Sequence, residues 1–467
     1  MANAQSRIDA VLARAEANFA GSVDRFISLL GIPSVSGSPD DRAGLAACAD
    51  WLVARLDESG VPARRIETAG NPVVLGLSPA APDRPTVLLY GHYDVQPSAP
   101  DDLWTSPPFE PAIRLVDGRQ VVYARGASDS KGQFWPMLEA IRAWREAEVP
   151  LPVNIIVLLE GEEETGSPSL AAFIDAHREQ LACDVALVSD SDMWSPTRPA
   201  ITTRMKGLVH EKVTVHAPNG DLHSGHFGTV AVNAVQVLSS ILGRIHAADG
   251  RVAVPGFHDG VPDLPAALRA EWSRLDPAEA LGSVSIEGGP REGGHSPIEL
   301  MWGRPGIDIN GIGGGNTGPA ERSVLPGSAH ARLSFRLVGG QEPEAVRQRF
   351  RDWVRAQLPP GCRAAFEGDY GTGAVTITET SPFIAATREA LDREWSEPSL
   401  LKGTGGTVPL VGLLADRLGV DCIVMGFILG DDAIHAADEH FDLERLRCAT
   451  RSWVRIFDAI GRVETAR

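Results

Sequence analysis

The chain has 467 residues, of which 43% are hydrophobic and 22% are charged, a balance typical of globular proteins rather than disordered or fibrous ones. Its 61 acidic and 43 basic residues give a net charge of −18, which argues against nucleic acid or an anionic membrane as a partner. The length exceeds that of one ordinary hydrophobic core, so we expect two or three domains.

The cysteine pattern and the apolar runs indicate in which cellular compartment the protein is expected. The five cysteines are scattered and form no C-x-x-C pair, which argues against a disulfide framework and against a thiolate zinc site. The N-terminus lacks the apolar stretch of a signal peptide, and no apolar run approaches the roughly 18 residues of a membrane span. We therefore expect a cytoplasmic protein.

The N-terminal part alternates between helical and strand patterns. Helical periodicity covers residues 5–30 and 41–59, and further helices are predicted at 132–147 and 169–180. Short runs rich in Val, Ile and Leu are predicted strands; they lie at 64–77, 86–91, 153–159 and 184–189. Apolar strands that alternate with helices indicate an α/β domain with a mainly parallel sheet, flanked by helices on both faces.

The pattern changes after residue 206. Residues 209–216 and 331–337 alternate apolar and polar side chains, as expected of half-exposed antiparallel strands. A predicted helix (230–246) and a Gly/Pro-rich stretch (249–327) lie between them. The later predicted elements are a helix at 343–357, strands at 362–368 and 422–427, and a final helix from Leu443. We therefore predict a discontinuous α/β domain of residues 1–206 and 379–467, with an α+β domain of residues 207–378 inserted in it.

The first strand-end motif is Gly91-His92-Tyr93-Asp94, which follows an apolar run. Ligands of α/β proteins bind at the carboxyl ends of strands, and a metal-bound histidine usually has a partner that orients it, often a carboxylate. His92 is therefore a candidate metal ligand, and Asp94 is the candidate that orients it. Taken alone, the motif fits an ordinary polar strand end at least as well.

Further acids and an imidazole follow other predicted strands. Asp129 precedes a helix, where an N-cap is the common alternative. An acidic cluster at residues 160–164 follows a buried strand; solvated loops are the usual alternative there. Asp190 ends another strand, and His435 follows the last one. Two imidazoles and several carboxylates at one sheet edge suit a two-metal site, and a carboxylate that binds no metal would serve as general base.

Three motifs together resemble a known family. They are residues 91–97 (GHYDVQP), 125–132 (RGASDSKG) and 160–167 (EGEEETGS). The chain resembles the di-metal metallopeptidases that include carnosinases, cytosolic nonspecific dipeptidases, aminoacylases and desuccinylases, and is most similar to the dipeptidase branch. The resemblance runs from about residue 24 to residue 459. It implies that the discontinuous α/β domain is catalytic, and that the inserted domain is a lid that also forms a homodimer.

The resemblance also implies the metal ligands. One metal would be held by His92 and Asp190, the other by Glu164 and His435, and Asp129 would bridge both. Asp192 is a rival to Asp190, but the spacing from Asp190 to Pro199 matches that of the family.

Catalytic roles follow from the same resemblance. Glu163 would be the general base that takes a proton from the attacking water and later delivers it to the leaving amine. Asp94 would orient His92. His223 would reach across the dimer to stabilise the oxyanion; the alternative is an exposed loop histidine.

Substrate contacts are implied as well. Arg336 would hold the terminal carboxylate of the substrate, although alternation alone also fits a cross-strand ion pair. Ser323 stands where the family has a threonine and keeps its hydroxyl. Gly406 and Thr407 would contribute backbone contacts, with a plain turn as the alternative.

Some positions depart from the family pattern. Ser130 replaces the acid or asparagine that follows the bridging aspartate; the family has a cis peptide there, so we expect one between Asp129 and Ser130. Gly403-Thr404 replaces Arg-Glu, and His435-Ala436-Ala437-Asp438-Glu439 replaces His-Ser-Pro-Asn-Glu. The ligands persist, so hydrolysis is expected, whereas the substrate is left open.

The resemblance predicts hydrolysis of the amide bond of dipeptides or short peptides with two divalent metal ions per subunit. The alternative is an N-acyl-amino-acid deacylase of the aminoacylase or desuccinylase type. Zn²⁺ suits the mixed ligand set, and Mn²⁺ or Co²⁺ would fit as well. A metal-binding module without catalysis is disfavoured because the base, Glu163, is present.

Overall fold

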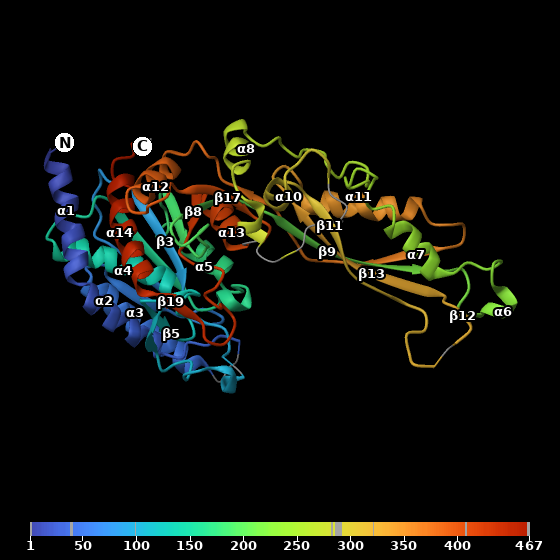
Figure 1. The fold of residues 1–467 in the computed structure, drawn as a ribbon, viewed down its shortest axis with the longest axis horizontal. Helices are drawn as coiled ribbons and strands as arrows, with labels where there is room; N and C mark the ends of the chain where they lie inside the picture. The colour runs from blue at the N-terminus through green and yellow to red at the C-terminus, as the bar shows by residue number, and fades with distance from the viewer. Residues whose placement is uncertain are drawn as a thin grey trace. The chain divides into compact units, whose positions relative to one another are not determined.

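The computed structural model describes residues 2–37, 41–98, 100–281, 284, 292–320, 322–406 and 409–464 (Figure 1). The chain divides into two compact units. The first comprises Met1–Thr203, Ile377–Leu401 and Leu413–Arg467, and the second comprises Arg204–Thr376 and Lys402–Gly412. Among the helices that the structure describes, none combines the length and the apolar character that a membrane crossing requires.

The first unit contains most of a large mixed sheet, whose last strand, β16 (Val375–Thr376), belongs to the second unit. Its strand order is β1-β2-β6-β3-β7-β18-β8-β16, and β17 also pairs with β8. The strands are β1 (Ala63–Ile66), β2 (Val73–Leu77), β3 (Thr86–His92), β6 (Asn154–Glu160), β7 (Val185–Ser189), β8 (Ala200–Met205), β16 (Val375–Thr376), β17 (Leu400–Thr404) and β18 (Asp421–Met425).

The predicted α/β sheet is confirmed, but parallel pairing is confined to its centre. Strands β6, β3, β7 and β18 are parallel to their neighbours in this group. Pairs β1–β2, β2–β6, β18–β8 and β8–β16 are antiparallel. A short connection such as that between β1 and β2 permits only an antiparallel pair, because a parallel pair needs a long crossover.

Helices surround this sheet and bury its central strands. Helix α14 packs on α4, α1 and α12, whereas α3 packs on β1 and β2 (Figure 1). Helix α4 is buried on almost its whole circumference, as expected of a helix enclosed by other elements. The helices are α1 (Ala2–Ala17), α2 (Phe19–Leu30), α3 (Arg42–Glu58), α4 (Lys131–Glu146), α5 (Leu170–Ala176), α12 (Pro382–Asp392), α13 (Pro409–Leu418) and α14 (Leu443–Ile460).

A small antiparallel sheet, β19-β5-β4, was not predicted from the sequence. It joins β4 (Ala112–Val116) and β5 (Arg119–Tyr123) to β19 (His440–Asp442). Next to this pairing, the amide of Ala124 donates to the carbonyl of Glu439 at 3.0 Å. The small sheet therefore places the loop before residue 440 beside the loop after residue 123, although more than 300 residues separate them in the sequence.

The second unit is built on an antiparallel sheet of order β11-β13-β9-β14, with β15 also paired to β9. Its strands are β9 (Gly207–His216), β11 (Gly306–Gly314), β13 (Ser328–Leu337), β14 (Arg363–Glu367) and β15 (Gly371–Thr372). Alternate residues Val209, Val213 and Val215 point into a core that also contains residues of α7 (Ala234–Leu242) and α11 (Pro343–Ala356). The alternation that predicted β9 and β13 is thereby confirmed, whereas β11 lies in the Gly/Pro-rich stretch and was missed.

Short elements complete the chain. A two-stranded sheet pairs β10 (Leu222–His223) with β12 (Val324–Leu325). The remaining helical turns are η2 (Asp101–Leu103), η3 (Glu163–Thr165), α6 (Ser224–Phe227), α8 (Ala266–Trp272), α9 (Pro277–Leu281) and α10 (Pro297–Gly303).

Candidate metal centre

Acids and an imidazole lie where three neighbouring parallel strands end. Strand β3 ends at His92, β6 leads into Glu163 and Glu164, and β7 leads into Asp190. Because β6, β3 and β7 are parallel neighbours, their carboxyl ends meet at one sheet edge. The parallel strands formed by these apolar runs therefore place the side chains at the same edge of the sheet.

Two groups of side chains there have the composition of metal sites. In the first, His92 Nε2 lies 3.3 Å from Asp129 Oδ1 and 3.9 Å from Asp190 Oδ2. In the second, His435 Nε2 lies 2.9 Å from Asp129 Oδ2 and 3.3 Å from Glu164 Oε2. Within each group the candidate ligand atoms lie within 4.8 Å of one another, and Asp129 belongs to both.

The rival aspartate is not brought into this arrangement. Among the residues that the structure describes, Asp192 belongs to neither group, whereas Asp190 does. The bond between Asp129 and Ser130 is cis, so the cis peptide expected at this position is confirmed.

The buried polar atoms fit metal ions. His92 Nε2 and Glu164 Oε1 are buried and make no hydrogen bond within the described part of the chain. Unpartnered buried polar atoms are costly, and histidine nitrogen with carboxylate oxygen is a donor set that divalent transition metals take.

The electrostatics agree with this interpretation. Burial lowers the pKa of His92, but the nearby carboxylates of Asp129 and Asp94 outweigh it and hold that pKa well above its ordinary value. Hydrogen bonds with Asp129 and Glu164 raise the pKa of His435 to about 10. Burial and the neighbouring carboxylates raise the pKa of Asp190, although His92 acts in the opposite direction. The concentrated negative charge therefore favours added positive charge at this edge.

Glu163 lies beside these groups without belonging to either. Its Oε2 is 3.9 Å from His92 Nε2, and its side chain is 31% exposed. Burial, helped by the carboxylates of Glu164 and Asp94 and opposed by His92, raises the pKa of Glu163. A carboxylate of raised pKa that is not among the candidate metal ligands is able to accept a proton, which makes Glu163 a candidate general base.

Asp94 has two kinds of contact. Its Oδ1 lies 3.4 Å from His92 Nδ1, while its own backbone carbonyl is closer to that nitrogen, at 3.1 Å. Its two carboxylate oxygens also accept from the backbone amides of Glu163 and Glu164, at 3.2 and 3.1 Å. The carboxylate thus ties the end of β3 to the loop that follows β6, a contact that the sequence did not indicate.

Glu439 is a further residue that the sequence interpretation left without a role. Its fully buried carboxylate accepts from Arg125 Nη1 at 2.7 Å and from the amides of Gly126, Ser128 and Asp129 at 2.8–2.9 Å. It therefore holds the backbone of the residue that both ligand groups share. A buried arginine needs a counter-ion, but the sequence carries no sign of which distant acid provides it.

The remaining predicted residues belong to the second unit. His223 is exposed and caps α6, where its Nδ1 accepts from the amide of Gly225 at 3.1 Å. Pairing of β10 with β12 brings it near Ser323, whose carbonyl accepts from the amide of Ser224 at 2.9 Å. Arg336 lies on β13.

The loop after β17 is described only in part. Gly406 is exposed, and its carbonyl accepts from the amide of Lys206 at 3.1 Å. Thr407 lies outside the described residues.

Comparison with known proteins identifies the class. The model of "Peptidase family M20/M25/M40" matches residues 88–459, so the chain belongs to this peptidase family. The family predicted from the motifs is confirmed.

The chain is also similar to individual members of this family. The chain is 27% identical over 444 residues to the Cys-Gly metallodipeptidase dug1 of Schizosaccharomyces pombe, covering 90% of this chain and 92% of that protein. It is 29% identical over 404 residues to the cysteinylglycine-S-conjugate dipeptidase of Corynebacterium striatum, covering 84% and 85%. The crystal structure of the M20 family metallo-carboxypeptidase Sso-CP2 from Sulfolobus solfataricus is similar with a TM-score of 0.74 and 26% identity, covering 95% and 99%.

Proposed function

We propose that this metallopeptidase hydrolyses the amide bond of dipeptides or short peptides, using two divalent metal ions and Glu163 as general base. The observation that carries the proposal is the pair of ligand groups that share Asp129, with Glu163 beside them and outside both. The names of the similar proteins, which are dipeptidases, support the substrate class.

We assign one metal ion to each of the two candidate ligand groups. His92 and Asp190 would hold one ion, Glu164 and His435 the other, and Asp129 would contact both. When bound, the ions would polarise the scissile carbonyl and lower the pKa of a water ligand toward about 7. Zn²⁺ is our first choice because it accepts imidazole nitrogen with carboxylate oxygen; Mn²⁺ and Co²⁺ are the alternatives.

The protein side chains move the proton and place the substrate. Glu163 Oε2 takes a proton from the attacking water and returns it to the nitrogen of the leaving amine. His223 of a second subunit donates to the developing oxyanion. Arg336 binds the terminal carboxylate of the substrate. The Ser323 hydroxyl and the backbone of Gly406 and Thr407 complete the substrate contacts.

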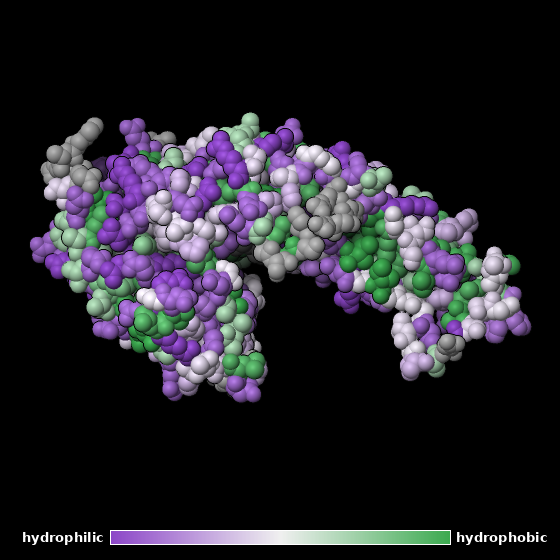
Figure 2. Space-filling view, in the orientation of Figure 1, coloured by the Kyte–Doolittle hydropathy of each residue, from purple (hydrophilic) through white to green (hydrophobic). Residues whose placement is uncertain are grey.

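We further propose that residues 207–378 act as a lid and dimerisation domain, with residues 1–206 and 379–467 as the catalytic domain. Strand β11 lies at the edge of its sheet and carries two exposed apolar side chains, Ile309 at 40% and Ile312 at 60% exposure. Figure 2 shows apolar surface on this unit beside α7. Exposed apolar edge strands are characteristic of surfaces that pair with another chain.

We also propose a cytoplasmic location. The support is that all five cysteines are free thiols, as is usual in a reducing compartment.

The experiment that tests the function compares dipeptides with N-acyl amino acids, using protein loaded in turn with Zn²⁺, Mn²⁺ or Co²⁺. Faster turnover of dipeptides is expected, whereas faster turnover of the N-acyl series would make the protein a deacylase.

Glu163→Gln tests the mechanism. We expect turnover to fall by about 10²–10⁴-fold because the general base is lost, while metal analysis still finds two ions per subunit. Glu179→Gln, an exposed residue on the same unit, is the matched control. Wild-type turnover in E163Q would remove Glu163 from the mechanism.

A further inference from the structure

The loop after β6, residues 161–169, carries both Glu163 and Glu164. Asp94, at the end of β3, holds this loop through the two backbone amides described above. The loop between β1 and β2, residues 67–72, contacts it as well. Both ligand groups are made of other residues, so the contacts of this second loop bear on the position of the acids and not on metal ligation.

Glu162 joins the two loops. Its side chain is only 6% exposed, and its Oε1 accepts from the amide of Asn71 at 2.7 Å, while its Oε2 accepts from the amide of Ser169 at 3.1 Å. One of these amides lies in each loop. Hydrogen bonds to an ionised carboxylate are stronger than those between neutral groups, and only a side chain with two acceptor atoms satisfies both amides.

The backbone of Glu162 begins the turn that carries Glu163. The carbonyl of Glu162 accepts from the amide of Thr165 at 3.1 Å and from the amide of Ser167 at 2.8 Å, which closes the turn η3. Side chain and backbone of one residue are therefore both fixed. A shift of the Glu162 carboxylate moves the start of η3, and with it the neighbouring Glu163.

Two further contacts draw the same segments together. Asn71 Nδ2 donates to the carbonyl of Gly161 at 2.7 Å, and the hydroxyl of Tyr93 donates to the carbonyl of Pro72. The Tyr93 ring lies against Gly161, where a Cβ atom would be 2.6 Å from the hydroxyl oxygen. The end of β3, the β1–β2 loop and the loop after β6 are thus packed on one another.

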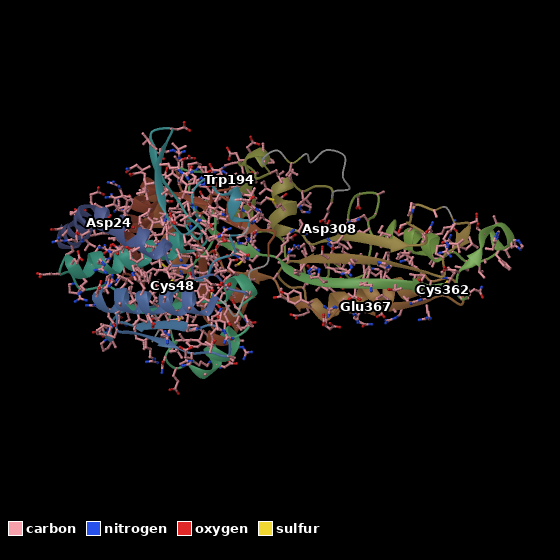
Figure 3. All side chains as sticks on the ribbon, turned by 90° about the horizontal axis from the view of Figure 1, so that it is seen from below. Asp24, Cys48, Trp194, Asp308, Cys362 and Glu367 are labelled. Atoms are coloured by element: carbon pink, nitrogen blue, oxygen red, sulfur yellow. The ribbon has the colours of Figure 1, made fainter. Side chains whose placement is uncertain are left out.

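Gly70 provides the space that Glu162 occupies. A Cβ atom at Gly70 would lie 1.5 Å from Glu162 Oε1, so a larger residue there displaces the carboxylate. The β1–β2 loop is itself well supported. Thr68 Oγ1 donates to the carbonyl of Asn71 at 2.7 Å and accepts from the amide of Gly70 at 3.0 Å. Helix α3, which carries Cys48 (labelled in Figure 3), packs on both β1 and β2.

We infer that Glu162 is a positioning residue which, together with Gly70 and Asn71, holds Glu163 in place for proton transfer. This inference rests on the proposed function, in which Glu163 is the general base. A displacement of about 1 Å at a reacting group can lower a rate about 100-fold. The proposed substrate contacts are made by other residues, so the loss of Glu162 lowers kcat more than it raises KM.

The test changes the two sides of this contact separately. Glu162→Ala removes both acceptors, Glu162→Gln keeps one, and Gly70→Ala places a methyl group where the carboxylate lies. Asn154→Ala is the matched control, because Asn154 begins the same strand β6 and its side chain bonds to both backbone groups of Ala81. Gly373→Ala controls for the glycine substitution at an exposed site with room for a Cβ atom.

The assay measures kcat and KM for a dipeptide, on protein that metal analysis shows to hold two ions per subunit. E162A and G70A are expected to lower kcat about 10- to 100-fold, with a smaller loss in E162Q. The double variant G70A/E162A keeps the kcat of E162A, because the methyl group no longer meets a carboxylate. N154A and G373A keep the wild-type kcat, even where the melting temperature of N154A falls.

The outcomes that overturn the inference differ in what else they remove. Wild-type kcat in E162A and G70A, or an equal loss of kcat in N154A, refutes the positioning role alone. Losses that add up in the double variant do the same, because they show that the two residues act independently. A wild-type protein that hydrolyses neither dipeptides nor N-acyl amino acids refutes the proposed function together with this inference. If thermal unfolding shows that E162A or G70A is not folded, E162Q and Asn71→Ala decide, and wild-type kcat in both refutes the inference.

Discussion

Glu439→Gln is the sharpest perturbation that the structure offers, because it changes one charge without changing volume. Each carboxylate oxygen of Glu439 accepts two hydrogen bonds. Oε1 accepts from the amides of Ser128 and Asp129, and Oε2 accepts from the amide of Gly126 and from Arg125. In glutamine one of these oxygens becomes an NH₂ group, which donates hydrogen bonds and accepts none.

The magnitude follows from the contacts. Whichever way the amide turns, two buried donors lose their acceptor, at about 1–3 kcal/mol each. In either orientation the neutral amide removes the counter-ion of the buried guanidinium, and breaking such a pair costs about 3–5 kcal/mol as a whole, within the range given by the two lost acceptors. We therefore expect the free energy of unfolding of the first unit to fall by about 2–6 kcal/mol, a large part of the roughly 5–15 kcal/mol that a folded protein has.

The same change displaces the backbone of Asp129, which both ligand groups share. Loss of a group that supports a metal ligand typically lowers metal affinity about 10- to 100-fold. The assays are denaturant unfolding and competition for metal with a chelator. Glu367→Gln, on the surface beside Lys212, is the control and is expected to leave both measurements unchanged. An E439Q protein that unfolds at the wild-type midpoint and holds metal with wild-type affinity would refute the reasoning.

Three further predictions concern the candidate metal centre and the proposed dimer. Asp94→Asn should lower turnover or metal affinity about 10- to 100-fold while circular dichroism is unchanged, because it weakens support for His92 and for the loop after β6; full activity would contradict this. Removal of metal by a chelator should lower the melting temperature, since ions at about 100 times their Kd add about 2.7 kcal/mol, and re-addition should restore it; an unchanged melting temperature would argue against bound metal. Ile312→Asp should shift a dimer to a monomer in sedimentation, whereas Leu115→Asp, which changes an exposed leucine of the first unit, should not; a dimeric I312D protein would exclude β11 from the interface.

Much of the metal centre is predictable because its side chains lie at strand ends. An apolar run that stops at His92, or at Asp190, is visible in the sequence, and parallel strands necessarily present their carboxyl ends together. The structure brings these side chains within reach of Asp129, as the sequence interpretation expected. Alternation likewise predicted β9 and β13, since its period of two follows directly from strand geometry.

Other features escaped because they depend on contacts between distant segments. Strand β11 has too many glycines for its pattern to be recognised, and it forms only because β13 offers a partner. The outer strands of the large sheet are antiparallel because of the paths that their connecting segments take. Hydrophobic periodicity predicts strands but does not predict those paths.

The contact between Glu439 and Asp129 separates most clearly what the sequence determines from what only the tertiary structure decides. The sequence alone determined which residues end the strands, because hydrophobic periodicity and the ligand chemistry are local properties. Only the tertiary structure decided that Glu439 supports Asp129, 310 positions away, and that burial raises the pKa of Glu439. A buried hydrogen bond across that separation depends on the pairing of β19 with β5, which no local pattern encodes.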